Sequence, residues 1–144
     1  MSAAETRPPR TQRADASTRF DAAAETLRSR SMVLAAWAFG SAARGTDGPT
    51  SDLDIAILAE RPLALMERLR LRADLVEHLG REVDLVVMND APPLLRWEVL
   101  SDHRRLFATD EELVDDFELR CQREYLDTRH LREVQRRLAR EALA

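Results

Sequence analysis

Two aspartates separated by a single residue, Asp52 and Asp54, open an apolar segment that ends at Leu58. Alternate residues of a β-strand point to the same face, with Cα atoms about 6.5 Å apart, so both carboxylates can enter one pocket. Carboxylates held this close repel each other unless a cation neutralises them. Mg²⁺ prefers oxygen ligands and keeps part of its shell for water and substrate phosphates, so the pair predicts a magnesium–phosphate site.

A third carboxylate is needed for phosphoryl transfer at such a site. Two ions about 3.5–4 Å apart can hold the attacking and leaving oxygens of the displacement. A further carboxylate would hold an ion beside the attacking hydroxyl or take the proton of that hydroxyl. Asp84, at the head of the apolar run 83–88, is the candidate, although on its own it could equally be a polar strand-entry residue.

The segment before the aspartate pair is a turn that holds three of the four glycines of the chain. Gly40-Ser41 opens this turn directly after the apolar run 33–39. Glycine lets the backbone approach a phosphate closely, and Ser41 offers a hydroxyl and an N–H at the start of a short helical turn, which favours anions. Arg44, one turn further, could bind the same phosphates through its guanidinium. Each residue is common in ordinary turns, and only their order and spacing together indicate a phosphate site.

The elements expected around these residues alternate between strand and helix. The strands are predicted at 33–39, 52–58, 83–88 and, at a sheet edge, 105–108. The helices are predicted after residue 15, at 62–79, from residue 92 and from residue 109 onward. This order predicts a small α/β domain.

Three of the predicted helices carry apolar positions at helical spacing. In the first helix these are Phe20, Ala23, Ala24 and Leu27. In the segment 62–79 these are Met66, Leu69, Ala73, Val76 and Leu79. In the last helix they are Val114, Phe117, Cys121, Thr128, Leu131, Val134 and Leu138. Each set is expected to face the core.

Length and composition limit the class of protein. Residues 1–14 combine Pro8-Pro9 with scattered arginines and predict a flexible tail, and residues 15–144 are expected to form one domain. No apolar run approaches the ~20 residues of a membrane span, and the N-terminus lacks the core of a secretory signal. A single cysteine, Cys121, is typical of a reducing, cytoplasmic location. The net charge of −4 makes a nucleic-acid partner unlikely.

The order Gly40-Ser41, ten residues, Asp52-x-Asp54 and a later strand aspartate resembles the signature of the DNA polymerase β-like nucleotidyltransferase superfamily. Within it, the string FGSAARGTDGPTSDLDIAIL is similar to the minimal nucleotidyltransferases, the antitoxins that are paired with HEPN ribonuclease toxins. The resemblance covers roughly residues 32–138. It implies a small polymerase β-like domain, with a mixed sheet flanked by helices and a long C-terminal helix.

The resemblance also implies roles for the matching residues. The magnesium ligands and catalytic residues would be Asp52, Asp54 and Asp84. The pair Gly40-Ser41 would hold the nucleotide phosphates, and Arg44 matches an arginine that is usual in the family. The substrate would be ATP, the partner a HEPN toxin, and the acceptor of AMP a tyrosine hydroxyl of that toxin.

Two other functions remain open at this stage. One is a small-molecule nucleotidyltransferase of the aminoglycoside-modifying type, which would need an acceptor cleft, built for example by dimerisation through the last helix. The other is a non-catalytic antitoxin that neutralises its toxin by occlusion alone. The presence of all three aspartates, Asp52, Asp54 and Asp84, favours catalysis over occlusion.

Overall fold

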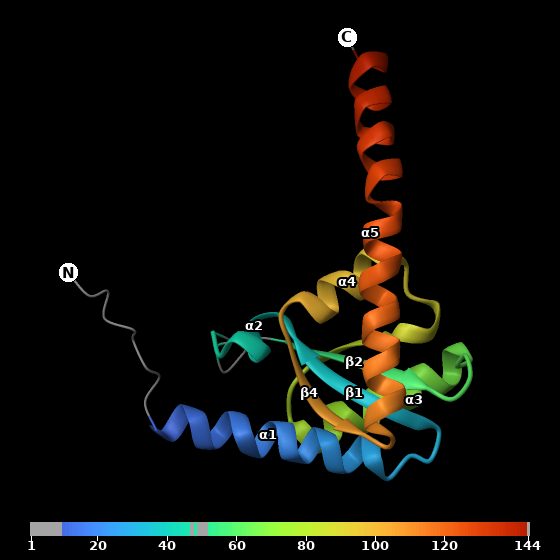
Figure 1. Cartoon of the computed structure of the whole chain (residues 1–144). Coiled ribbons are helices and arrows are strands. Elements are labelled where there is room, and N and C mark those ends of the chain that lie inside the picture. The colour runs from blue at the N-terminus through green and yellow to red at the C-terminus, as the bar shows by residue number, and fades with distance from the viewer. Residues whose placement is uncertain (1–9, 47, 49–51, 144) are drawn as a thin grey trace, which may run out of the picture.

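A computed structural model describes residues 10–46, 48 and 52–143 of the chain. They form a four-stranded mixed sheet with helices on both faces, and one long helix extends beyond the rest of the fold (Figure 1). The strands are β1 (Val33–Phe39), β2 (Leu53–Ala59), β3 (Val83–Val87) and β4 (His103–Ala108). The helices are α1 (Arg10–Arg28), α2 (Gly40–Arg44), α3 (Leu65–Leu79), the 3₁₀ helix η1 (Met88–Asp90), α4 (Pro93–Ser101) and α5 (Glu111–Ala142). The predicted α/β class, mixed sheet and long last helix are confirmed.

The order of the strands in the sheet is β3-β2-β1-β4. Strand β1 pairs antiparallel with β2 and with β4, whereas β2 and β3 are parallel. In this register Phe39 is opposite Asp54, and Asp54 is opposite Asp84. The end of β1 and the beginnings of β2 and β3 therefore meet at one end of the sheet, where the predicted site residues lie.

The two faces of the sheet are covered by different helices, and β2 shows why. Its Ile55 and Ile57 belong to the core cluster that includes Leu27 of α1 and Leu75 of α3. Its Ala56 and Leu58 belong to the cluster formed with α4 and α5. Alternate side chains of a strand point to opposite faces, so the alternation predicted for this segment is confirmed.

The first helix overlaps the segment predicted as an N-terminal tail. Helix α1 begins at Arg10, so residues 10–14 are helical, although the composition assigned them to a flexible tail. Arginine, glutamine and alanine are good helix formers, and a helix can be extended by such residues without an apolar stripe. Residues 1–9 lie outside the described part of the chain.

The apolar face predicted for α3 is wrong in part. Leu71 and Leu75 are buried, whereas the predicted positions Met66 and Leu69 are 57% and 47% exposed. Apolar residues surround much of this helix, so its sequence contains two overlapping stripes. Only one of them can face α1 and the sheet, and helical spacing alone did not identify which.

The apolar positions of α5 divide into two groups. Val114, Phe117 and Cys121 are buried as predicted, but Leu131 and Leu138 are 56% and 58% exposed. Figure 1 shows why, since the second half of α5 extends past the sheet and past α4. Among the described residues, none of the helices has the length and apolar character needed to cross a membrane.

Candidate active site

The three predicted aspartates meet at the end of the sheet where β2 and β3 begin. Asp54 and Asp84 are direct cross-strand partners, and Asp52 lies just before β2. Asp54 is half-buried, whereas Asp52 and Asp84 are exposed. One carboxylate is thus held under the surface, and the other two are accessible to a substrate.

The electrostatics of Asp54 confirm that these groups lie within reach of one another. Burial raises the pKa of the Asp54 carboxyl above its ordinary value, and the negative charges of Asp84 and Asp52 raise it further. A side-chain hydrogen bond with Asp84 acts in the same direction, whereas the positive charge of Arg44 lowers this pKa. The cluster therefore holds more negative charge than its own residues neutralise.

Gly40 is required by the position of Asp54. The backbone of Gly40 has φ +66°, a left-handed conformation that favours glycine. A Cβ atom at this position would lie 2.4 Å from Oδ2 of Asp54, well inside van der Waals contact. The prediction for Gly40 was close approach to a phosphate. The structure adds a second reason, which is that the glycine leaves room for a carboxylate of the site.

Helix α2 begins at Gly40 and carries Ser41, which is half-buried. The residue at its N-cap, Phe39, provides no side-chain acceptor, so no side chain caps the first N–H groups of the helix. The turn closes when the N–H of Thr46 donates to the carbonyl of Ser41 at 2.9 Å. The remaining residues of the predicted phosphate turn, Asp47, Pro49, Thr50 and Ser51, lie outside the described residues.

Arg44 at the end of α2 is paired with Asp102, a residue that sequence reasoning did not select. Its Nη1 donates to Oδ2 of Asp102 at 3.1 Å. The two side chains are 52% and 51% exposed, so the pair is a surface ion pair of small net stability. The residues are 58 positions apart in sequence, and no local pattern indicates their contact. The pair holds the guanidinium beside the carboxylate cluster, where its positive charge acts on Asp54.

A partly buried hydrogen-bond network supports β1 beneath the site. The fully buried Trp37 donates its Nε1–H to Oε1 of Glu118 on α5 at 2.8 Å. The other carboxylate oxygen of Glu118 accepts from Nη2 of Arg105 on β4 at 2.8 Å. The network ties β1, β4 and α5 together three residues before Gly40. It fixes the strand from which α2 begins.

The donor set of the site fits magnesium. In residues 10–46, 48 and 52–143, no three Asp, Glu, His or Cys side chains form a ready-made metal cage. Magnesium does not need one, because it is usually bound by one or two carboxylates, with its other positions filled by water and substrate phosphates. Burial raises the pKa of Asp54 most, and the negative charges of Asp84 and Asp52, which a divalent cation would neutralise, raise this pKa further.

Comparisons with known proteins agree with this geometry. A proposed protein adenylyltransferase of Methanocaldococcus jannaschii is 39% identical over 64 residues, which are 44% of this chain and 69% of that protein. The protein adenylyltransferase MntA of Shewanella oneidensis is 35% identical over 74 residues. That match spans 51% of this chain but only about half, 53%, of MntA.

Solved structures share the fold over nearly their whole length. A chain of a toxin–antitoxin complex crystallised with AMP-PNP superposes with a TM-score of 0.74 at 26% identity, covering 87% of this chain and 98% of that one. A chain of a complex between a tri-AMPylated Shewanella oneidensis HEPN toxin and its MNT antitoxin gives a TM-score of 0.67. The identity there is 23% over 92% of this chain and 99% of that one, so this likeness concerns the fold alone.

The family itself is identified by a model that spans most of the fold. Residues 22–112 match the model of the polymerase β nucleotidyltransferases, and this range includes α2, the three aspartates and α4. With its mixed sheet, its carboxylate cluster and the glycine turn beside it, the chain belongs to the polymerase β nucleotidyltransferase family.

Proposed function

We propose that this chain transfers AMP from ATP to a tyrosine hydroxyl of a HEPN-family toxin and thereby acts as its antitoxin. The observation that carries the proposal is the placement of Asp54 under Gly40, opposite Asp84 and next to Asp52. The adenylyltransferase activity named for MntA supports the reaction type. The toxin–antitoxin complex with AMP-PNP supports both an adenine nucleotide and a toxin partner.

The proposed reaction is an in-line displacement at the α-phosphorus of ATP. The hydroxyl oxygen forms a bond to the α-phosphorus, the bond from this phosphorus to the bridging oxygen breaks, and pyrophosphate leaves. In this proposal the carboxylate of Asp84 takes the hydroxyl proton, and its exposure and its pairing opposite Asp54 support that role. Magnesium, when bound by Asp52 and Asp54, would neutralise the charge of the triphosphate.

The residues of α2 bind the nucleotide in this proposal. Ser41 contributes its hydroxyl and its N–H to the phosphates, and Gly40 lets the chain approach them. Arg44 leaves Asp102 and pairs with a phosphate, for which its planar guanidinium is well suited. The exposure of Asp52 and Asp84 leaves the site open to an acceptor as large as a protein.

The decisive experiment measures the mass of the acceptor. The chain is incubated with ATP, magnesium and a cognate HEPN-family protein, and intact-protein mass spectrometry detects each added AMP. Asp52→Asn combined with Asp54→Asn should reduce the transfer by about 10³-fold or more, because the proposed ligands of the metal lose their charge. The matched control is Asp21→Asn combined with Asp116→Asn, which removes two exposed carboxylates elsewhere and should leave the transfer unchanged.

Two outcomes contradict the proposal. Full activity of the Asp52/Asp54 variant would show that the site is assigned to the wrong residues. Neutralisation of the toxin without any change in mass, by the wild-type chain and the variant alike, would show that the antitoxin acts by occlusion.

A further inference from the structure

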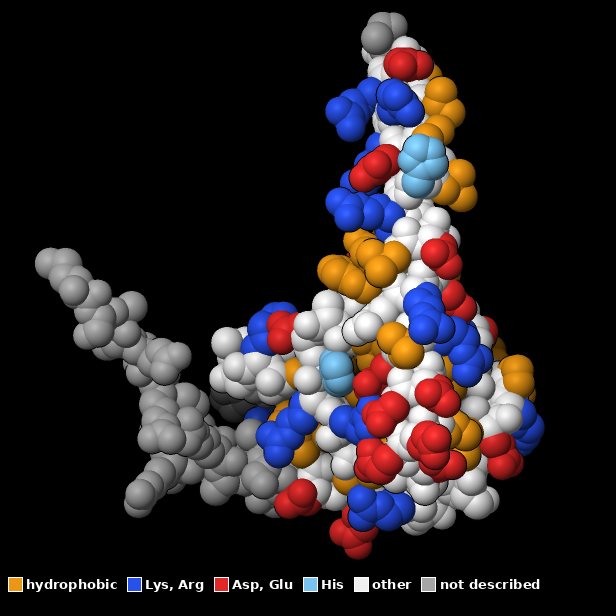
Figure 2. Space-filling view, viewed as in Figure 1, with side chains coloured by type: hydrophobic (Ala, Val, Ile, Leu, Met, Phe, Trp, Pro, Cys, Tyr) orange, Lys and Arg blue, Asp and Glu red, His pale blue; other side chains and the backbone are white. Residues whose placement is uncertain are grey.

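The last part of α5, residues 129–143, is named here the α5 arm. All of its side chains are exposed except those of Arg132 and Val134, which are half-buried. At about 1.5 Å per residue the arm is about 22 Å long. Figures 1 and 2 show it as a column that rises beyond the sheet and the other helices. Isolated helices of about 12–15 residues are marginally stable in water, so a helix of this kind gains from packing against another surface.

The α5 arm carries an apolar stripe that is separate from the core face of the same helix. Leu131, Val134 and Leu138 follow one another at intervals of three and four residues, which is the spacing of a helix–helix seam. At about 100° per residue, this stripe is rotated by roughly 100° from the side that buries Phe117 and Cys121. The stripe is therefore a second apolar face and does not continue the core.

The charge of the α5 arm indicates what can cover this stripe. The arm contains five arginines and two glutamates, whereas the whole chain has a net charge of −4. Figure 2 shows blue side chains along the arm and red ones gathered on the body below it. Two arms paired side by side would bring positive charge against positive charge. An acidic partner suits the arm better than a second arm does.

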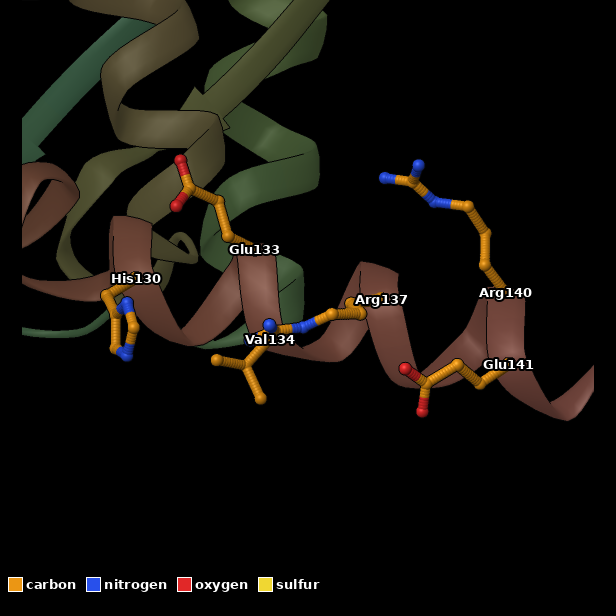
Figure 3. Close-up of a pocket in the computed structure, with 6 residues that line it drawn as sticks. All are labelled: His130, Glu133, Val134, Arg137, Arg140 and Glu141. Carbon is orange, nitrogen blue, oxygen red and sulfur yellow. The ribbon is translucent and has the colours of Figure 1, made fainter.

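The side of the arm next to the stripe is open and shallow. A hollow there is lined by His130, Glu133, Val134, Arg137, Arg140 and Glu141. Figure 3 shows that all six come from α5, with Arg137 projecting beside Val134. Within the described part of the chain, neither Arg136 nor Arg137 makes an ion pair, so Arg137 can bind a carboxylate of a partner.

The base of the arm is fixed to the body near the catalytic end. The Trp97 ring of α4 stacks on Tyr125 of α5 with centroids 4.4 Å apart, and the guanidinium of Arg132 lies 4.2 Å from the Tyr125 ring. Helix α4 is about 13 Å long and is followed directly by Asp102, the partner of Arg44. One short helix thus connects the base of the arm with the carboxylate site.

We propose that the α5 arm binds an amphipathic helix of the protein acceptor, one with an apolar stripe flanked by acidic residues, and so holds the acceptor beside the carboxylate site. The proposal rests on the proposed function only in identifying the bound protein as the acceptor of AMP. The arm offers too short a seam to form a large interface, so the acceptor also contacts the body near α2 and α4.

The first test removes the stripe without disturbing the core. Leu131→Ser with Leu138→Ser should weaken binding of the cognate HEPN-family protein by about tenfold or more, because both leucines become buried in the complex. The matched control, Leu119→Ser with Leu126→Ser, changes two exposed leucines of α5 outside the arm and should alter the Kd by less than about twofold. In the transfer assay the stripe variant should raise KM for the acceptor, while kcat and the affinity for magnesium AMP-PNP stay unchanged.

The second test concerns charge. Arg137→Glu should weaken binding by about three- to tenfold at low salt, and the loss should shrink in 0.5 M salt because exposed charges are then screened. Arg136→Glu makes the same change about 100° around the helix from Arg137, on the side that faces away from the stripe, and should have little effect. If Arg136→Glu weakens binding as much as Arg137→Glu does, the acidic residues of the partner helix do not lie on the Arg137 side of the stripe.

Binding and transfer are measured separately, so the two proposals can fail separately. If the wild-type chain binds the HEPN protein through the stripe but adds no AMP, the proposed function fails and the docking surface stands. If transfer occurs and the stripe variant binds and transfers like wild type, the docking proposal is overturned. It is also overturned if sedimentation shows a wild-type dimer that the stripe variant abolishes, or if only a labelled RNA binds the arm and Arg137→Glu releases it.

Discussion

The carboxylate site and the α5 arm differ in what specifies their residues. At the site, contacts within the chain explain Gly40, which leaves room for the Asp54 carboxylate, and hold Arg44, which pairs with Asp102. In the arm, Leu131 and Leu138 keep a helical spacing, yet both are more than half exposed and neither belongs to a core cluster of the described residues. A regular pattern of apolar residues can therefore serve packing within the chain or binding to another molecule. The burial of the side chains in the free chain distinguishes the two cases.

The largest expected effect concerns Asp84. If its carboxylate takes the proton of the hydroxyl, Asp84→Asn should lower the turnover rate by about 10²–10⁴-fold. The affinity for magnesium AMP-PNP should change much less, since Asp52 and Asp54 remain. Single-turnover kinetics and calorimetry measure the two quantities. Unchanged transfer would show that Asp84 is only a polar residue at the start of β3. The carboxylate site would then consist of Asp52 and Asp54 alone.

The two glycines at the ends of α2, Gly40 and Gly45, can be compared directly. Gly40→Ala should lower the transfer by about 10²-fold, because the new methyl group displaces the Asp54 carboxylate and a 1 Å displacement of a reacting group can have an effect of this size. Gly45→Ala is the matched control. It has a similar φ of +72°, but a Cβ there meets nothing within 4 Å.

Both alanine variants should lose about 1–2 kcal/mol of stability from the left-handed conformation, and only Gly40→Ala should lose the activity. Thermal melts and transfer assays on the two variants test this. If Gly45→Ala loses as much activity as Gly40→Ala, backbone strain rather than the contact with Asp54 explains both.

The pH dependence of stability gives a smaller effect at the same site. The folded state raises the pKa of Asp54 above 3.8, so its contribution to stability is complete below that value and is lost as the pH rises through the raised pKa. Without metal, Asp54→Asn should therefore melt a few degrees higher than wild type at pH 7, and this difference should shrink toward pH 4. Magnesium with AMP-PNP should stabilise the wild type more than the variant. If the difference in melting temperature between the variant and the wild type stays constant across this pH range, the ionised Asp54 does not destabilise the fold.

The smallest effect is expected in the arm. Deleting residues 134–144 should change the free energy of unfolding by less than about 0.5 kcal/mol, because the described residues of this segment, 134–143, contribute no fully buried side chain. Phe117→Ala, in the packed half of the same helix, should lose about 3–5 kcal/mol. Urea denaturation measures both. A strongly destabilised truncation would show that the arm stabilises the fold and is not reserved for a partner.

Much of the site could be predicted because its residues are local in sequence. The pairing of Asp52 with Asp54 and the opening of the turn at Gly40-Ser41 follow from strand spacing and turn chemistry. Asp84 could be selected because it lies at the head of a third apolar run, and the parallel pairing of β2 with β3 then places it opposite Asp54.

What the sequence left out depends on contacts between distant segments. Asp102 meets Arg44 only because α4 and β4 return to the end of β1, and no local pattern encodes that return. The buried side of α3 depends on where α1 lies, so two apolar stripes could not be ranked. The last helix was expected from residue 109 onward, but Asp110 caps α5 by accepting the N–H of Leu113, while the hydroxyl of Thr109 donates to the carbonyl of Leu34 on β1.

The two tryptophans of the chain provide a separate optical reporter for each of the two regions. Trp37 is fully buried and hydrogen-bonded beneath the carboxylate site, so its emission is expected at short wavelength and insensitive to aqueous quenchers. Trp97 is half-buried and stacked on Tyr125 at the base of the α5 arm, where a bound protein would change its exposure. Replacing each with phenylalanine in turn would assign the fluorescence, so that acceptor docking and nucleotide binding could be followed in the same solution without a label.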